Sequence, residues 1–205
     1  MLEVAGSLWS VEESERAEMA SELARAGLRR LHWDMSDGVF AAPGGFDAKT
    51  AERLAMAAGL RNEAHLMAVD PRREVDAWTD FCDRVFVHVE AEGWEAAVDR
   101  VVARGSEPGL AVSPGTAVDG LPDGVSILCM TIVPGQAGSA FSDPLLAKAV
   151  RLAADGTRSV GIDGGVQTAH AARAEEAGIG WVVVGTDLIA PGGLARWAPR
   201  LAPAI

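Results

Sequence analysis

The stretch Leu31-His32-Trp33-Asp34-Met35-Ser36-Asp37-Gly38 decides how the rest of the chain is interpreted. His32 and Asp34 are two residues apart at the end of an apolar run, and residues i and i+2 of a strand point to the same face. An imidazole and a carboxylate then project together from one strand end, and such a pair can form half of a divalent-metal site. The same pair also fits a capping Asp and a buried His satisfied by its neighbours. The choice between these interpretations depends on partners elsewhere in the chain.

Short apolar runs alternate with amphipathic segments along the whole chain. We predict eight strands, at residues 2–8, 28–34, 62–67, 84–89, 109–112, 125–132, 159–162 and 181–184. Helices are predicted at residues 10–26, 48–58, 72–81, 94–103, 143–154 and 168–177, with a short return segment at 116–122 and a last helix after Gly193. Ser10 is predicted to cap the first helix and Gly27 to end it. A loop rich in Gly and Pro is expected at residues 38–46.

This alternation predicts an α/β fold in which residues 1–205 form a single (β/α)₈ TIM-barrel domain, at the short end of the size range for that fold. The alternative is a doubly wound open sheet, which needs a Gly-rich dinucleotide turn after its first strand. The segment Gly6-Ser7-Leu8-Trp9-Ser10 is not that turn. In a barrel, functional side chains are expected at the C-terminal ends of the strands.

Composition limits the partners and the compartment. The formal net charge of −11 disfavours nucleic acid and anionic membrane surfaces as partners. Cys82 and Cys129 lie in apolar stretches and form no metal-spaced pair, which favours a reducing compartment. The chain shows neither a basic-then-apolar leader nor an apolar run of membrane-spanning length. We therefore expect a soluble, cytoplasmic protein whose partner is a small molecule. A homo-oligomer is a separate expectation.

Polar side chains gather at the predicted strand ends. Besides His32 and Asp34, they include Ser7, Asp37, His65, His88, Glu90, Ser113, Asp163 and Thr186. Three of the chain's four histidines belong to this set, whereas His170 falls on a predicted helix and is expected to be a solvated surface residue. This concentration favours a functional site over isolated structural roles.

Taken in order, seven segments share one pattern with a known family. They are Ser7, His32-Trp33-Asp34-Met35-Ser36-Asp37-Gly38, His65-Leu66-Met67, His88-Val89-Glu90, Met130-Thr131-Ile132-Val133-Pro134-Gly135, Asp163-Gly164-Gly165 and Val184-Gly185-Thr186. Over nearly the whole chain this pattern resembles the ribulose-phosphate 3-epimerase family. The resemblance implies a (β/α)₈ barrel of the ribulose-phosphate-binding type. It also implies an isomerase of pentose phosphate metabolism that interconverts D-ribulose 5-phosphate and D-xylulose 5-phosphate through an enediolate.

The resemblance further implies the roles of individual residues. One divalent metal ion per chain would be bound by His32, Asp34, His65 and Asp163, with Asp34 and Asp163 also acting as the acid and the base. This mixed N/O set favours Zn²⁺, with Mn²⁺, Fe²⁺ or Co²⁺ as alternatives. Backbone N–H groups of Gly-bearing loops suit a phosphate, and thioethers would shield a planar intermediate from water. The expected substrate-binding residues are Ser7, Met35, Met67, Met130, Gly135, Gly138, Ser139, Gly164, Gly165, Gly185 and Thr186.

The chain departs from the family pattern mainly at the phosphate end. Where the family has Pro-Gly-Phe-Gly-Gly-Gln, this chain has Pro134-Gly135-Gln136-Ala137-Gly138-Ser139. A Cβ at position 137 would be unfavourable if the backbone there needs positive φ. Asp187 stands where the family has a small apolar residue, and its carboxylate would repel a phosphate unless it points away. The walls also differ, at Trp9, Trp33 and Pro43.

Two other functions stay open. One is the 3-epimerisation of another ketose or ketose phosphate, such as a hexulose 6-phosphate. The other is a non-catalytic sugar-phosphate-binding barrel, although the presence of all four ligand-type residues argues against it. Related decarboxylases and synthases carry an Asp-x-Lys-x-x-Asp signature, and Asp34-Met35-Ser36-Asp37 lacks its lysine and its spacing. The only lysines, Lys49 and Lys148, fall on predicted helices, which excludes a Schiff-base lysine at a strand end.

Overall fold

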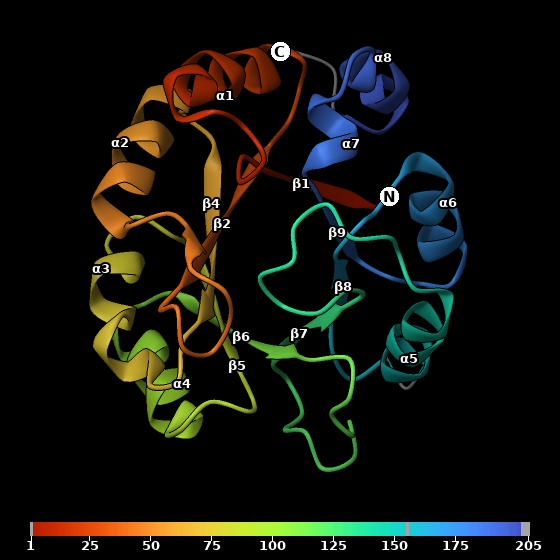
Figure 1. Ribbon diagram of the computed structural model, residues 1–205. Coiled ribbons are helices and arrows are strands. Elements are labelled where there is room, and N and C mark those ends of the chain that lie inside the picture. The colour runs from red at the N-terminus through yellow and green to blue at the C-terminus, as the bar shows by residue number, and fades with distance from the viewer. Residues whose placement is uncertain (1, 155, 202–205) are drawn as a thin grey trace.

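The computed structural model describes residues 2–154 and 156–201, and the strands within them form one closed barrel. The strands are β1 Glu3–Ser7, β2 Arg30–Ser36, β3 Gly44–Gly45, β4 Arg61–Met67, β5 Arg84–His88, β6 Glu107–Val112, β7 Ser126–Met130, β8 Val160–Asp163 and β9 Trp181–Val184. All are parallel neighbours in chain order except β3, which pairs antiparallel with β2. Pairing of β1 with both β2 and β9 closes the ring (Figure 1).

Helices surround this barrel and cover its outer face (Figure 1). They are α1 Arg16–Arg25, α2 Ala48–Ala58, α3 Val75–Thr79, α4 Trp94–Ala103, α5 Asp143–Ala153, α6 Thr168–Glu176, α7 Thr186–Ile189 and α8 Gly193–Trp197, with the 3₁₀ turns η1 Glu13–Glu15, η2 Pro71–Arg73 and η3 Ala198–Arg200. The predicted (β/α)₈ barrel is confirmed. No helix in the described ranges is both long and apolar enough to cross a membrane.

The first helix begins later than predicted. Ser10 does not cap it, because the Val11 N–H donates to Leu8 O at 3.0 Å and forms a turn there instead. The turn η1 then leads into α1 at Arg16, where no side chain caps the helix. Gly27, with φ of 96°, follows the last helical turn as predicted, since a residue without Cβ adopts this left-handed backbone at little cost.

Strand β3 lies within the segment predicted to be only a loop. Its residues pair with Met35 and Ser36, and the Phe46 N–H donates to Asp34 O at 2.9 Å. Gly45 has φ of 79°, and a Cβ there would lie 2.1 Å from Asp34 O. The return of the chain, on the edge of β2 that is not paired with β4, therefore fixes the backbone around Asp34. The short return segment predicted at residues 116–122 contains no helix.

The barrel interior is packed by large side chains set against glycines. Phe86 and Trp181 stack with ring centroids 5.8 Å apart. A Cβ on Gly109 would lie 2.2 Å from Phe86, and one on Gly161 would lie 2.0 Å from Trp181. Toward the start of β5, the Arg84 guanidinium lies 4.3 Å from the Trp181 ring centroid.

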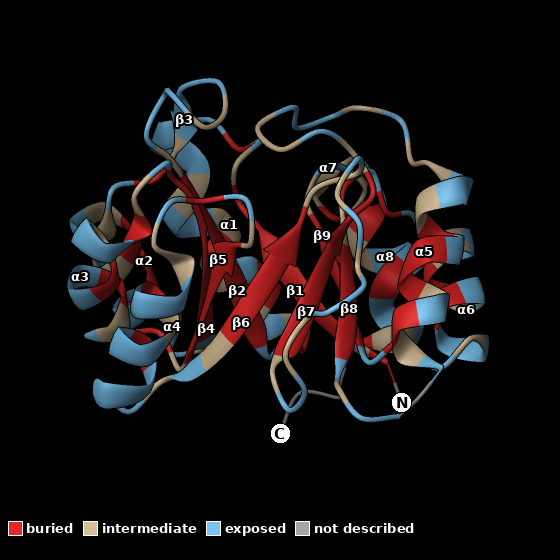
Figure 2. Ribbon diagram, turned by 90° about the horizontal axis from the view of Figure 1, so that it is seen from below, coloured by how far each residue is buried: buried red, intermediate tan, exposed pale blue. Residues whose placement is uncertain are grey.

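A second and larger apolar cluster fills the layer between the strands and the helices. It accounts for the pattern in Figure 2, where the strands are buried and the outer helix faces are exposed. Loops that follow the strands gather at one end of the barrel, together with β3 and α7 (Figure 2). That end carries the polar residues singled out in the sequence.

Candidate metal centre and substrate cavity

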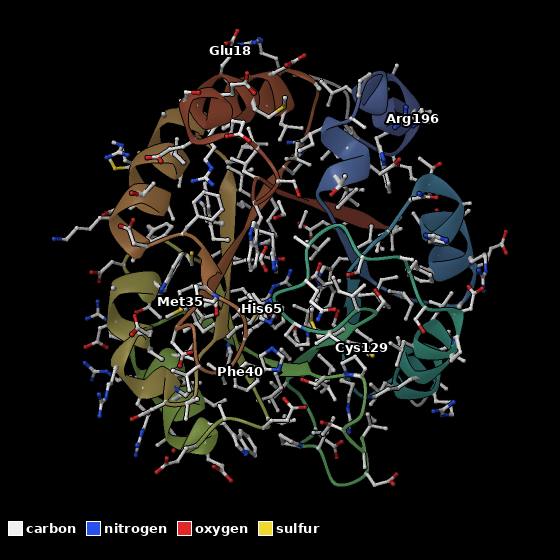
Figure 3. All side chains as sticks on the ribbon, in the orientation of Figure 1. Glu18, Met35, Phe40, His65, Cys129 and Arg196 are labelled. Carbon is white, nitrogen blue, oxygen red and sulfur yellow. The ribbon has the colours of Figure 1, made fainter. Side chains whose placement is uncertain are left out.

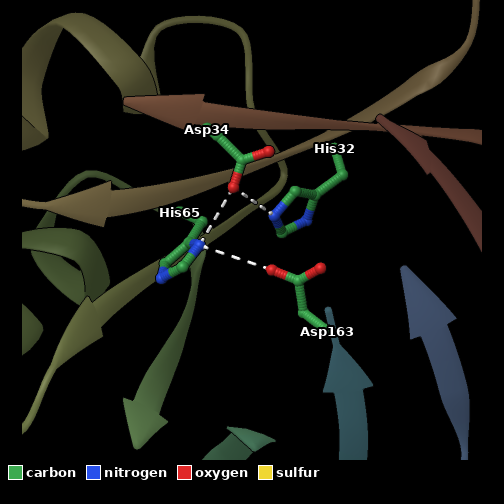
Figure 4. Close-up of side chains that lie close together, drawn as sticks. All are labelled: His32, Asp34, His65 and Asp163. Atoms are coloured by element: carbon green, nitrogen blue, oxygen red, sulfur yellow. Dashed lines mark hydrogen bonds and ion pairs between the residues drawn. The ribbon is translucent and has the colours of Figure 1, made fainter. Parts of the chain in front are cut away.

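Four ligand-type side chains from three strands meet at this end of the barrel. His32 and Asp34 project from β2, His65 from β4 and Asp163 from the end of β8 (Figure 4). Each offers one ligand atom, and these atoms all lie within 4.8 Å of one another. In the sheet register Asp34 is the partner of His65 on the neighbouring strand, so adjacent strands place their side chains together. The structure thus brings together the whole predicted ligand set.

The distances within this cluster leave one donor atom without a partner. His65 Nδ1 lies 3.1 Å from Asp34 Oδ1 and 3.8 Å from Asp163 Oδ2. His32 Nε2 lies 3.3 Å from Asp34 Oδ1, yet this buried nitrogen makes no hydrogen bond in the described residues. An unpartnered buried nitrogen is costly, and a cation among two imidazoles and two carboxylates would satisfy it. The donor set therefore fits a divalent metal ion.

The charges of the cluster also favour a bound cation. Burial lowers the pKa of His32, but the carboxylates of Asp34 and Glu63 outweigh burial and raise it well above its usual value. Burial raises the pKa of Asp34, but the two imidazoles hold it well below its usual range. Burial, followed by the charge of Asp34, raises the pKa of Asp163 to about 6. The cluster attracts positive charge, and its two carboxyl groups differ in proton affinity.

Glu63 fixes the ring of His32 from behind, a role not deduced from the sequence. Its Oε1 lies 2.7 Å from His32 Nδ1, and its Oε2 accepts from Arg84 Nη2 at 2.5 Å. Burial raises the pKa of Glu63, but the His32 hydrogen bond and the Arg84 charge lower it to about 2. The signal was available in the sequence, because Glu63 stands two residues before His65 and so faces the same side of β4.

A cavity of about 480 Å³ opens above Asp34 and Asp163. Most of the predicted substrate-binding residues line it: Ser7, Met67, Met130, Gly135, Gly138, Ser139, Gly164, Gly165, Gly185 and Thr186. Met35 does not, and lies in the outer apolar cluster, farther from the barrel axis than His65 (Figure 3). The reason is the alternation of a strand, since the residue after the inward-facing Asp34 points outward.

The residues that depart from the family pattern are accommodated at the cavity rim. The Asp187 carboxylate accepts hydrogen bonds from Trp197 Nε1 at 2.8 Å and from Arg196 Nη2 at 3.2 Å. Its charge is therefore directed toward α8 and partly neutralised. Ala137 is exposed, and among the described residues only glycines have positive φ, so its Cβ is not strained. Both residues nevertheless line the cavity.

His170 is not the solvated surface residue expected from the sequence. It is half-buried along the cavity, with its ring stacked on Phe141 at a centroid distance of 3.9 Å. Its Nδ1 accepts the Gln167 N–H at 3.1 Å, which closes the first turn of α6. Phe141 lies on the loop after β7, so contact with that loop draws the imidazole inward. The helical pattern alone could not reveal a partner on another loop.

A closed (β/α)₈ barrel whose polar side chains converge at the C-terminal ends of its strands is an enzyme architecture. Within that class, the chain belongs to the ribulose-phosphate 3-epimerase family, whose sequence model matches residues 3–189. Its members are isomerases that act on carbohydrates. The resemblance inferred from the motifs is confirmed.

Comparisons with individual proteins agree with this assignment. The chain is similar to the ribulose-phosphate 3-epimerase of Mycobacterium tuberculosis (strain ATCC 25618 / H37Rv), with 31% identity over 189 residues, covering 86% of this chain and 82% of that protein. It is 25% identical over 196 residues to the cytoplasmic isoform of ribulose-phosphate 3-epimerase from Oryza sativa subsp. japonica, covering 90% of this chain and 86% of that protein. The fold is similar to that of the N-acetylmannosamine-6-phosphate 2-epimerase of Clostridium perfringens, with TM-score 0.66, 13% identity and coverage of 97% and 89%.

Proposed function

We propose that this protein is a metal-dependent 3-epimerase that interconverts D-ribulose 5-phosphate and D-xylulose 5-phosphate. The observation that carries the proposal is the placement of the Asp34 and Asp163 carboxyl groups around one cluster of ligand atoms at the floor of the cavity. They come from β2 and β8, with β1 and β9 between them, so they reach a bound substrate from different directions. Inversion at a carbon requires a base on one face and an acid on the other.

The chain's own residues provide for that proton transfer. In one direction Asp34 accepts the proton from carbon 3 while Asp163 delivers a proton to the opposite face, and in the reverse direction the two roles are exchanged. The Ser7 hydroxyl donates to Asp34 Oδ2 at 3.0 Å and so orients the carboxylate. After one turnover the protonation states are exchanged, which prepares the site for the reverse reaction.

The proposed metal ion is held by His32, Asp34, His65 and Asp163, one ion per chain. When bound, a divalent ion supplies a Lewis acid that polarises the ketone and stabilises the negative charge of an enediolate. Zn²⁺ is the ion that we propose first, since two nitrogen and two oxygen donors suit it, with Mn²⁺, Fe²⁺ and Co²⁺ as alternatives. Met67 and Met130 add apolar surface around the reacting carbons.

The opposite end of the cavity would bind the phosphate. The glycines there free backbone N–H groups at the loops after β7, β8 and β9. Gly165, with φ of 64°, brings two of these loops together, because a Cβ on it would lie 2.6 Å from Ser139 O. His170 adds a donor, since its Nδ1 accepts a backbone N–H and the neutral ring then carries its proton on Nε2. We therefore propose a phosphorylated ketose rather than a free sugar.

A hexulose 6-phosphate is the second candidate substrate. It is favoured by Gln136, which lines the cavity, is exposed, and replaces a phenylalanine of the family pattern. A less bulky rim leaves room for one more carbon. The reaction centre would be the same, so the two candidates differ only in the length of the ketose.

Turnover with a panel of ketoses tests the substrate. Epimerisation at carbon 3 is measured for ribulose 5-phosphate, a hexulose 6-phosphate and unphosphorylated ribulose, and we expect the first to have the highest kcat/KM. A higher value for the hexulose 6-phosphate would select the second candidate. Equal values with and without the phosphate would contradict the proposed anion site. A metal-loaded protein that turns over no ketose would leave only the non-catalytic alternative.

Substitution of the two carboxylates tests the chemistry. We expect Asp34→Asn and Asp163→Asn each to lower kcat by at least two orders of magnitude, since general acid–base catalysis contributes roughly 10²–10⁴-fold. Asp99→Asn, an exposed carboxylate on α4, is the matched control. Exchange of the carbon-3 proton with solvent should differ between the two variants, because each retains a different member of the pair. Near-normal kcat in either variant would remove that residue from the acid–base role.

The compartment and the assembly belong to the same proposal. Cys82 and Cys129 are both buried free thiols, which is compatible with a reducing cytoplasm. A homo-oligomer of chains that each form one barrel domain remains our expectation. Sedimentation of the purified protein measures the assembly directly.

A further inference from the structure

Three side chains form a line that begins at the candidate ligand His65. His65 Nε2 lies 2.8 Å from His88 Nε2, and His88 Nδ1 lies 2.9 Å from Glu90 Oε2. His88 ends β5, the neighbour of β4, and both imidazoles are fully buried. Neither His88 nor Glu90 lines the substrate cavity. Their contacts therefore run to a candidate metal ligand and not to the substrate.

The position of each proton in this line follows from the geometry. His65 Nδ1 faces the carboxylates of Asp34 and Asp163, so this nitrogen is the one available to a metal ion. A nitrogen that binds metal carries no proton, and the neutral imidazole then carries its proton on Nε2. His65 must therefore donate to His88 Nε2. His88 in turn carries its proton on Nδ1 and donates it to Glu90.

The opposite arrangement is disfavoured by Glu90. If His88 donated to His65, the proton of His65 would move to Nδ1 and block the position of the metal. His88 Nδ1 would then present a lone pair to a carboxylate oxygen 2.9 Å away, and a carboxylate can only accept. Glu90 thus selects the tautomer of His88, and His88 selects the tautomer of His65.

Glu90 is itself held in place by a second loop. Its Oε1 accepts the Ser113 N–H at 2.9 Å. The buried Lys148 of α5 donates from Nζ to the carbonyl oxygens of Ser113 at 2.8 Å and Thr116 at 2.7 Å, which secures that loop. The Phe40 ring covers His88 at a centroid distance of 4.5 Å. The Glu90 end of the line is therefore held by contacts with other segments of the chain.

We propose that His88 and Glu90 are positioning residues for the metal ligand His65. They keep Nδ1 of His65 unprotonated and directed at the centre, and so raise the affinity of the site for a divalent ion. The inference rests on the proposed function, because it assumes that the four-residue cluster binds metal. His32 obtains the same support directly from a carboxylate, that of Glu63, so the two histidine ligands are oriented by different means.

The test measures metal binding rather than turnover. The dissociation constant for Zn²⁺ is determined by competition with a chromophoric chelator, and the Co²⁺ absorption spectrum reports the ligand geometry. We expect His88→Phe, which keeps a ring beside Phe40 but offers no acceptor, to weaken Zn²⁺ binding about 10- to 100-fold. Glu90→Gln should weaken it about tenfold, since support from outside the ligands is worth roughly this much.

A conservative variant and a control separate positioning from a general structural role. His88→Gln restores an acceptor oxygen for His65 Nε2, so it should recover most of the Zn²⁺ affinity that His88→Phe loses. Glu92→Gln, an exposed carboxylate two residues beyond Glu90, should leave the affinity unchanged. A purely structural role predicts lower stability of the metal-free variants, with unchanged Zn²⁺ affinity and an unchanged Co²⁺ spectrum, and that result would overturn the proposal.

The outcome also separates this inference from the proposed function. If the wild-type protein binds Zn²⁺ and epimerises its substrate, but His88→Phe binds Zn²⁺ equally well, only the positioning role fails. If the wild-type protein binds no divalent ion, the metal dependence fails and the positioning role fails with it.

Discussion

Substitution of Glu63 is the sharpest test of how the metal centre is supported. Glu63 is fully buried and joins His32 Nδ1 to Arg84, so Glu63→Gln keeps the shape of the side chain but leaves Arg84 without its buried countercharge. Removing one partner of a buried pair costs roughly 3–5 kcal/mol, because the other charge remains desolvated. For a chain of this size that loss lowers Tm by roughly 6–20 °C.

The pH dependence of the same variant follows from the pKa. The pKa of Glu63 is lowered from 4.5 to about 2 on folding, so its charge stabilises the folded state at every pH above 4.5. That contribution declines as the pH falls through this window toward 2. The difference in unfolding free energy between wild type and Glu63→Gln should therefore be greatest near neutral pH and shrink below pH 4.5.

The assay is urea unfolding of the metal-free proteins, with exposed Glu13→Gln as the matched control. A second variant, Glu63→Gln with Arg84→Met, removes both charges and should recover part of the stability, since a neutral pair needs no countercharge. The reasoning would be refuted if Glu63→Gln unfolded like the control. It would also be refuted if the double variant were less stable than the sum of the two single changes predicts.

Three further predictions concern the metal, a glycine and the cavity rim. At a Zn²⁺ concentration 100 times its dissociation constant, the ion should stabilise the folded chain by about 2.7 kcal/mol, and thermal unfolding should show no such gain for His65→Ala. Gly45→Ala should destabilise the fold by roughly 1–3 kcal/mol more than Gly59→Ala in urea unfolding, because both glycines have positive φ but only at position 45 does a Cβ meet backbone. Asp187→Ala should lower stability by roughly 1–3 kcal/mol without improving KM for the phosphorylated ketose, because it leaves the buried Trp197 N–H unpartnered. An improved KM would show instead that the carboxylate repels the phosphate.

The barrel could be predicted from the sequence because each strand is a short apolar run between turn residues. The ligand cluster could be predicted because strand ends converge in this fold, so His32, Asp34, His65 and Asp163 needed only their strands to be placed. The segments that pack around this cluster could not be predicted from the sequence. A two-residue strand such as β3 has no side-chain period, and its pairing depends on the backbone of Asp34.

The positions of several side chains were beyond a one-dimensional pattern for other reasons. Met35 belongs to the family motif, yet its place in the strand turns it away from the cavity. His88 and Glu90 were recognised as a motif, but the hydrogen bonds that join them to His65 depend on ring orientations across two strands. His170 is drawn inward by Phe141, a contact between segments that only folding brings together.

The glycines inside the barrel have a consequence for how this sequence can diverge. Trp181 fills the space that a side chain at Gly161 would need, and Phe86 fills the space that a side chain at Gly109 would need. The combined side-chain volume of each pair is therefore limited. A mutation that enlarges either glycine meets a ring that cannot retreat, because the two rings stack on each other. Along an evolutionary path, residues 109 and 161 are therefore free to change only after, or together with, a reduction at 86 or 181. Sequence variation at these four positions should be correlated. In each lineage the summed side-chain volume should stay nearly constant, while the position that carries the large side chain differs.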